Sequence, residues 1–298
     1  MVVQHNLTAM NSNRMLGITT SAQAKSTEKL SSGYKINRAA DDAAGLAISE
    51  KMRRQIRGLT QASANAQDGI SCVQTAEGAL TEVHDMLQRM NELAVKAANG
   101  TQTSTDRAYI NQEVQALVSE IDRVASTTTF NEKMLLDGSF SSIGLQVGAE
   151  ASQLITLNVS AMNAFGLGLT SVSSGVVDPD KIKTQMAKDG VKVRTKSSIS
   201  VGGTTGANAQ QAITLIKAAL KQVSKQRSDL GAVQNRLEHT IKNLDNVVEN
   251  TTSAESAIRD TDMASEMVKF SNNNILAQAG QSMLAQANQS NQGVLSLL

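Results

Sequence analysis

The sequence predicts a mainly α-helical protein, a long antiparallel helical bundle or coiled coil formed by its paired amino- and carboxy-terminal halves, with a small central β-hairpin region. Three observations predict this fold. Aromatic residues are only 2% of the 298 residues, so aliphatic side chains and 12 Met supply nearly all of the 40% hydrophobic content. Pro179 is the only proline, which leaves long helices uninterrupted. Apolar residues also recur at three- and four-residue spacings in both halves.

The longest predicted helix runs from Asp41 to Asn99. Asp41 or Asp42 can cap its start, and Asn99 followed by Gly100 supplies a stop signal. Its apolar spacing keeps one seam facing a partner helix. The seam contains Met52, Ile56, Leu59, Ile70, Val73, Leu80, Val83, Leu87 and Met90.

Two more helices are predicted, from Ser104 to Thr128 and from Ala207 to about Thr252, because each carries an apolar stripe of the same period. Three stripes that must bury one another favour an antiparallel bundle of about three helices.

The centre of the chain shows strand-like alternation instead. Apolar residues at every second position predict a β-hairpin near 143–159, and a second small hairpin is predicted from 191–193 and 199–201. A short helix is predicted to begin at Asp178. Because Ser, Thr and Gly are abundant around these elements, we expect 161–206 to be a small surface-exposed insertion with little core.

The two ends, 1–40 and 256–298, are rich in Asn, Gln, Ser, Thr and Ala and have thin apolar stripes. Ordering about 40 residues costs on the order of 60 kcal/mol at roughly 1.5 kcal/mol each. We therefore expect the ends to be mobile in the monomer and to fold when many copies pack together. The residues predicted to mediate that polymerisation are Leu7, Met10, Met267, Phe270, Ile275, Val294, Leu295, Leu297 and Leu298.

Charge and hydropathy exclude several functional classes. The formal net charge is +1, with no tail of like charge to attract nucleic acid or an anionic membrane. No stretch approaches the roughly 20 apolar residues of a membrane span. The amino-terminal sequence lacks the apolar core of a secretory signal. We therefore expect a cytoplasmic protein, or one exported without a cleaved signal.

No pattern of catalytic or metal-ligating residues stands out. His5, His84 and His239 have no metal-ligand spacing. Cys72 could form a nucleophile pair with a distant His, but its place on the helical stripe favours a buried thiol. The basic run at 50–57 lacks interleaved aromatics, which favours a solvated or subunit-contacting face over a nucleic-acid patch. The sequence therefore predicts no enzyme, no cofactor and no metal.

Several blocks, in matching order, resemble bacterial flagellin. Amino-terminal blocks are KLSSGYKIN at 29–37, DDAAGLAI at 41–48, GLTQAS at 58–63, NAQDGIS at 65–71 and TAEGAL at 75–80. Carboxy-terminal blocks are DLGAVQNRL at 229–237, LAQANQ at 284–289 and VLSLL at 294–298. The resemblance implies a subunit that self-assembles into the helical filament of the bacterial flagellum, the propeller for motility.

The resemblance also implies a division of the chain. Residues 1–40 and 256–298 map to an inner coiled-coil polymerisation domain. Residues 41–160 and 207–255 map to a rod-like helical domain that includes the hairpin, and 161–206 to the variable insertion.

Export and partners follow from the same resemblance. It implies a secreted protein of the extracellular filament, exported by the flagellar type III apparatus without signal cleavage. An export chaperone would hold the carboxy-terminal segment, and the filament cap and hook-associated junction proteins would be further partners. A hook–filament junction adaptor remains the alternative, although such proteins should deviate in the terminal blocks, which are intact here.

Flagellins are also ligands of an innate-immune Toll-like receptor of animal hosts. The residues that match the family's recognition segment are Gln88, Arg89, Glu92, Leu93 and Glu113.

Overall fold

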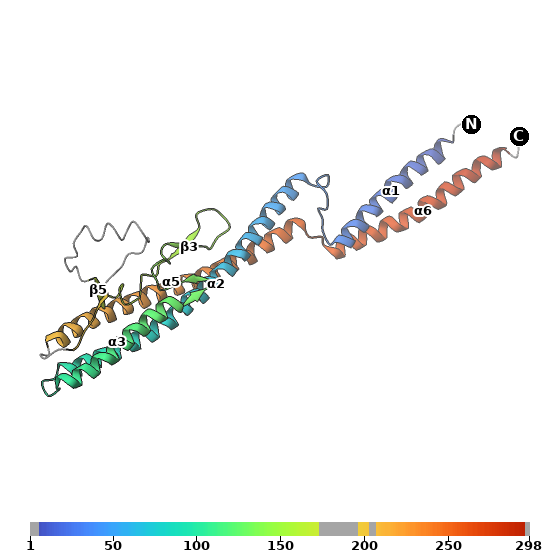
Figure 1. Cartoon of the computed structure of the whole chain (residues 1–298). Helices are drawn as coiled ribbons and strands as arrows, with labels where there is room; N and C mark the ends of the chain where they lie inside the picture. The colour runs from blue at the N-terminus through green and yellow to red at the C-terminus, as the bar shows by residue number, and fades with distance from the viewer. Residues whose placement is uncertain (1–5, 173–195, 203–206, 296–298) are drawn as a thin grey trace, which may run out of the picture. The chain divides into compact units, whose positions relative to one another are not determined.

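The computed structural model describes residues 6–172, 196–202 and 207–295, and it confirms the mainly α-helical fold. Its contacts divide the chain into two compact units, residues 1–58 with 246–298 and residues 59–245. The helices of the described residues are α1 (Leu7–Ser32), α2 (Ala43–Ala98), α3 (Ser104–Thr127), α5 (Ala207–Arg259) and α6 (Met263–Leu295). Figure 1 shows them in order along the chain.

The three helices predicted from apolar spacing are α2, α3 and α5, and local chemistry sets their ends. The backbone N–H of Gly45 donates to Asp42 Oδ1 at 2.9 Å, as expected of a helix cap. Thr103 and Asp106 form a reciprocal capping box at the start of α3. Arg107 closes the end of α2, since it donates to the carbonyl oxygens of Ala97 and Asn99 at 3.0 and 3.2 Å. Helix α5 extends to Arg259, seven residues beyond the predicted end.

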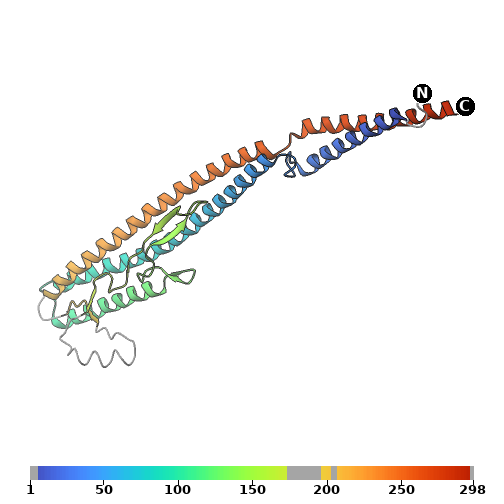
Figure 2. The same ribbon diagram turned by 90° about the horizontal axis from the view of Figure 1, so that it is seen from above.

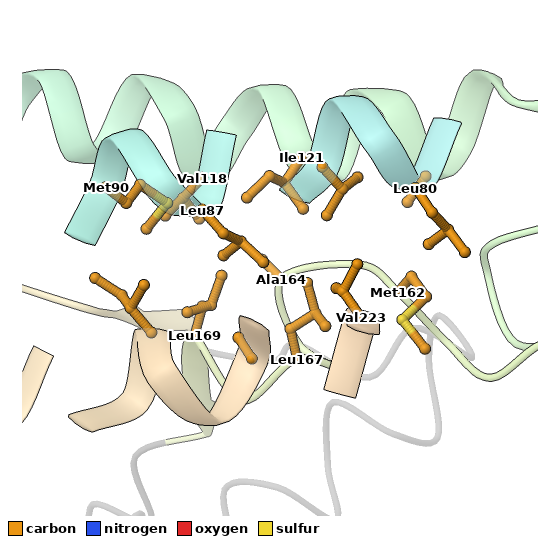
Figure 3. Packing of buried hydrophobic residues seen from close by; sticks show 14 of the residues in the cluster. Leu80, Leu87, Met90, Val118, Ile121, Met162, Ala164, Leu167, Leu169 and Val223 are labelled. Atoms are coloured by element: carbon orange, nitrogen blue, oxygen red, sulfur yellow. The ribbon is translucent and has the colours of Figure 1, made fainter. Parts of the chain in front are cut away.

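The second unit has a dense hydrophobic core. Side chains of α2 and α3 point toward those of α5 and of the segment that follows the central hairpin (Figure 3). Leu80, Leu87, Ile121, Val223 and Met162 are each at most 1% exposed. Burial of a large aliphatic side chain contributes about 1.5–3 kcal/mol, so this unit stabilises itself within one chain.

The predicted central hairpin is confirmed as β3 (Ile143–Gln146) paired antiparallel with β4 (Leu154–Leu157). Leu145 lies opposite Ile155, which packs in a small cluster with α2 and α5 residues. A Cβ at Gly69 would lie 2.6 Å from Leu145 Cδ1, so the glycine gives the hairpin room to approach α2.

The other strands differ from the prediction. Strand β5 (Thr170–Val172) pairs with β6 (Lys196–Ser198), so 199–201 is not the strand that the sequence predicted. The predicted partner at 191–193 and the helix beginning at Asp178 lie outside the described residues. The sequence analysis missed β1 (Thr129–Phe130) and β2 (Lys133–Met134), which are joined by a two-residue turn with positive φ at both residues.

The expectation of little core in 161–206 is wrong for its described flanks. Ala164, Leu167 and Leu169 are at most 4% exposed, and Ile199 and Val201 are buried in the same core. These apolar residues are spaced irregularly, because a loop that fills the gap between helices has no fixed period. Periodicity therefore gave no signal for them.

In the first unit, α1 and α6 lie side by side in both views (Figures 1 and 2). Asn6 caps α1 and Asp262 caps α6, and Gly33 ends α1 in the left-handed conformation at φ 76°. The segments next to these helices also meet, because Tyr34 pairs with Asp260 as an isolated β-bridge.

Candidate interaction surfaces

The α1–α6 pair exposes most of its large apolar side chains. Four of the predicted polymerisation residues are more than half exposed: Leu7 at 68%, Met10 at 64%, Met267 at 54% and Ile275 at 62%. Phe270 is half-buried. Large apolar side chains this exposed on two adjacent helices are typical of a surface that another molecule covers.

The last four predicted residues cannot be placed in this surface. Val294 and Leu295 belong to α6, but their side chains lie outside the description. Leu297 and Leu298 lie outside the described residues altogether.

Further apolar residues extend the surface beyond the predicted set. These residues, all at least 51% exposed, are Met15, Ile18, Val268, Leu276 and Met283. Met283 lies on the predicted stripe of Ile275 and Ala279, whereas the other four lie off the thin stripes that guided the prediction.

A shallow groove of about 320 Å³ runs between α1 and α6. Met15, Leu16, Leu276 and Met283 form its apolar lining, and Gly280 contributes no side chain. A Cβ at Gly280 would lie 3.3 Å from Leu16 Cδ1, so the helices approach closely there. Met15 and Met283 are both more than half exposed at this groove, and the flexible thioether side chain of Met can adapt to a covering surface.

One buried acidic side chain lies between the two helices. The Ser26 hydroxyl donates to Glu266 Oε1 at 2.7 Å, and Lys269 Nζ lies 3.1 Å from Glu266 Oε2. Burial raises the pKa of the Glu266 carboxyl, but the bonds from Ser26 and Lys269 and the nearby charge of Lys29 outweigh burial and hold that pKa below its ordinary value. Glu266 is therefore ionised at neutral pH with both oxygens paired.

The predicted recognition segment lies in the second unit, where Arg89 of α2 reaches Glu113 of α3. Arg89 Nε and Nη2 donate to Glu113 Oε1 at 3.0 and 2.9 Å, and Nη1 donates to Glu92 at 3.2 Å. The two carboxylates raise the pKa of Arg89. All three side chains are about half exposed or more, so the cluster presents alternating charges on the surface.

The remaining residues of this segment have different environments. Leu93 is only 4% exposed and belongs to the core. Gln88 is exposed and lies 2.9 Å from a ring nitrogen of His84. A cavity of about 350 Å³ beside the cluster is lined by Arg89, Leu93, Glu113 and the exposed Tyr109. The structure thus brings Arg89, Glu92 and Glu113 together and places Leu93 beneath them.

Cys72 is 5% exposed, and burial raises the pKa of its thiol although the charge of Lys133 opposes the shift. The predicted buried thiol is therefore confirmed.

Among the described residues, no three or more His, Cys, Asp or Glu side chains gather as metal ligands would. Within those same residues, no helix combines the length and apolar character that crossing a membrane requires. In the basic run, Arg53 pairs with Glu50 at 2.9 Å on an exposed face.

Two family models match the chain. The model described as the bacterial flagellin N-terminal helical region matches residues 3–141, and the bacterial flagellin C-terminal helical region matches residues 213–298. The chain is 53% identical over 298 residues to a flagellin of Halalkalibacterium halodurans, and the match covers all of both chains. It is 48% identical to a flagellar filament 31.3 kDa core protein of Treponema maltophilum, again over the whole of both chains.

Solved structures give a weaker likeness. A structure assigned as a flagellar hook-associated protein of Vibrio parahaemolyticus matches with a TM-score of 0.54 at 15% identity. The match covers 74% of this chain and 100% of that chain. At this identity the likeness concerns the fold alone.

Proposed function

The chain belongs to the bacterial flagellin family, and from this premise we propose that the α1–α6 pair is the surface through which its copies assemble. As a flagellin it is a structural subunit of the extracellular flagellar filament, its partners are copies of itself, and it is not an enzyme. The proposal assigns residues 1–40 and 256–298 to the inner polymerisation domain. It assigns 41–160 and 207–255 to the rod-like domain, and 161–206 to the variable insertion.

The observation that carries this proposal is the exposure of large apolar side chains on both helices. Leu7, Met10 and Ile275 are more than 60% exposed in one chain. Burial of each against a neighbouring copy would contribute about 1.5–3 kcal/mol. Summed over the exposed residues, such burial would add to the free energy that holds the two ends in place in an assembly.

Seeded polymerisation tests the proposal. Met10→Gln combined with Ile275→Gln does not lower helix propensity but removes apolar surface, so we expect at least a tenfold rise in the critical concentration. Met10→Leu with Ile275→Leu is the matched control and should polymerise like the parent. Normal filament growth by the Gln variant would refute the assignment of this surface.

The junction-adaptor alternative is separated by the same assay. An adaptor adds a limited number of copies to an existing end, whereas a filament subunit elongates seeds in proportion to the supply of monomer. Electron microscopy of filament length against monomer concentration discriminates between the two. The growth expected of a filament subunit is supported by matches that span whole flagellin chains.

A second role concerns the Arg89 cluster, which we propose as the recognition segment for an innate-immune Toll-like receptor. Arg89, Glu92 and Glu113 are exposed and fixed in place by their mutual bonds, so a complementary surface would meet a preorganised set of charges. Gln88 is exposed beside them, whereas Leu93 acts from beneath by supporting the backbone of α2.

Receptor binding by purified monomer tests this role. Arg89→Ala should weaken binding at least tenfold, since it removes the central charge. Lys217→Ala, a charge removal on the exposed face of α5, is the control and should leave binding unchanged. Equal binding by both variants would exclude this segment.

Export is the last proposed element. The flagellar type III apparatus exports the chain without signal cleavage, an export chaperone holds the carboxy-terminal segment beforehand, and the filament cap and hook-associated junction proteins contact the assembled chain. Support comes from family membership and from the exposed apolar residues of α6, which need cover before assembly. The intact mass of protein from filaments tests export without cleavage, because it should equal the mass of the whole chain. Chaperone binding tests the second point: the full chain should capture the chaperone, and a chain lacking 263–298 should not.

A further inference from the structure

The fully buried positions in the α1–α6 interface carry small or polar side chains, whereas Leu16 and Phe270 are half-buried. Among the described side chains of both helices, those that are at most 9% exposed are Ser26, Glu266, Ala277 and Ala287. Large side chains that insert into complementary holes normally fix the axial alignment of two helices. Small residues fit several alignments about equally well, so the buried Ala positions specify the register of this pair poorly. Leu16 packs closely over Gly280, but a glycine accepts a large side chain without being specific for it.

Two polar contacts tie the helices together at separate points. Asn6 Nδ2 donates to the carbonyl oxygen of Ala287 at 3.0 Å, and Ser26 Oγ donates to Glu266 Oε1 at 2.7 Å. The stretch from Asn6 to Ser26 on α1 is almost as long as the stretch from Glu266 to Ala287 on α6. Both contacts therefore belong to one antiparallel alignment.

The two contacts differ in what they can discriminate. Asn6 is half-buried and binds a backbone carbonyl, a group that every residue of α6 provides. Ser26 and Glu266 are 5% and 6% exposed, and no other residue of α6 is acidic. Only the second contact is specific to one alignment.

A slip of one helical turn, about 5.4 Å, would carry Ser26 away from Glu266. The carboxylate would then remain between the helices without its hydroxyl donor. Lys269 lies on the same helix as Glu266, so its bond to Oε2 would persist, but Oε1 would lose its donor from the facing helix. A buried charged acceptor without a donor is more unfavourable than a misplaced Ala or Ser. A buried polar residue in a two-helix seam can select register for this reason.

We propose that Glu266, held by Ser26, is the positioning residue that fixes the axial register of α1 against α6 in the assembled filament. This inference rests on the proposed function, because it assumes that the α1–α6 pair is the assembling region. It extends that function by naming the contact that makes all copies adopt the same alignment.

The test measures register directly in filaments of the full chain. Spin labels at Asn13→Cys and Gln281→Cys, both exposed positions on facing helices, report the α1–α6 distance in a Cys72→Ala background. Labelled chain is diluted into unlabelled chain of the same variant, so that only intramolecular distances contribute. The parent should give one narrow distance.

Three variants separate register from simple stabilisation. Ser26→Ala should raise the critical concentration about tenfold, because a charged acceptor loses its buried donor. Ser26→Ala with Glu266→Met makes the contact apolar, and its filaments should show a broadened or multiple distance. Ser26→Glu with Glu266→Ser exchanges the partners. Lys29 then lies three residues after the new carboxylate, just as Lys269 lies three residues after Glu266 in the parent, so the carboxylate keeps a nearby cation. This exchange should restore one narrow distance.

Glu28→Gln is the matched control, because it removes a charge from the exposed Arg38–Glu28 pair on the same helix. It should change neither the distance nor the critical concentration. One unchanged narrow distance in the apolar variant, or an exchanged variant that does not assemble with a single distance, overturns the proposal. If the Ser26→Ala, Glu266→Met variant fails to assemble, this result supports the register proposal only when the Ser26→Glu, Glu266→Ser variant assembles normally. Normal polymerisation of the Met10→Gln, Ile275→Gln chain would instead refute the underlying proposed function.

Discussion

The α2–α3–α5 core and the α1–α6 pair are both helical, yet they bury different kinds of side chain. In the first, Leu80, Leu87 and Ile121 are completely buried. In the second, the described buried positions are Ser26, Glu266 and two Ala, and most of the large apolar side chains are exposed. One region completes its packing within a single chain, whereas the other leaves its apolar surface for neighbours.

This difference shows that helical conformation and stability are separate properties. Helix α6 has its own cap at Asp262, and its interior lacks Pro. These local features favour a helix both in the monomer and in an assembly, but tertiary burial supplies most of the free energy that stabilises a helix. The expectation that both ends are mobile in the monomer stays a prediction.

The largest expected effect comes from removing residues 285–298. We expect complete loss of filament formation, because the deletion removes the end of α6 and the predicted polymerisation residues Val294, Leu295, Leu297 and Leu298, while the core of residues 59–245 remains folded. Sedimentation and circular dichroism of the truncated chain check both outcomes. A loss of helical content comparable to full unfolding would show that the two regions are not independent.

Leu87→Ala should destabilise the second unit by about 2–5 kcal/mol, since it leaves a cavity where a side chain is fully buried. Urea unfolding of the monomer, followed by circular dichroism, measures this change. Val95→Ala lies on the same helix at 54% exposure and is the control, with an expected change of about 0.5 kcal/mol or less. Similar losses for both variants would contradict the contrast between the regions.

Acid should weaken the α1–α6 pair through Glu266. Its pKa is lowered in the folded pair, so its contribution is fully present above the unfolded value of about 4.3 and is lost as the pH falls through the lower folded value. Lys29 and Lys269 are the cations near the carboxylate. In filament dissociation followed from pH 6 to pH 2.5, the advantage of the parent over Glu266→Gln should therefore shrink below about pH 4. An advantage that is constant with pH would argue against an ionised Glu266.

The smallest expected effect is at the surface of the second unit. Glu113→Gln breaks an ion pair whose side chains are 53% and 46% exposed, and solvent and salt screen such pairs. The unfolding midpoint of the monomer should not change measurably. A large loss of stability would mean that the Arg89 cluster belongs to the packing of α2 against α3.

Much of the fold could be predicted from the sequence. The ends of α2 and α3 lie within two residues of the predicted ones, because Asp42 and the stop at Asn99 act through local hydrogen bonds. The central hairpin was found from its alternating pattern. Strands β1 and β2 were missed because each has two residues, too few for a period.

The interaction surfaces were predictable only in part. Leu7, Met10 and Ile275 were found from spacing, but a stripe on one helix does not show whether another element covers it. Leu93 and Arg89 lie on the same helix, and both match the family's recognition segment. Only the packing in the structure shows that Leu93 is buried and that Arg89 is exposed. Glu266 gave no signal at all, since a single acid in a polar helix looks solvent-exposed.

The sequence by itself determined where α2 and α3 begin and end, which seams are apolar and which family the chain resembles, because caps, periods and motifs act over a few residues. Tertiary structure alone decided that Met162, Leu167 and Leu169 fill the core. It also decided that Ser26 meets Glu266 across two helices far apart in the chain. Burial and pairing of this kind depend on which distant segments meet, and no local pattern carries that information.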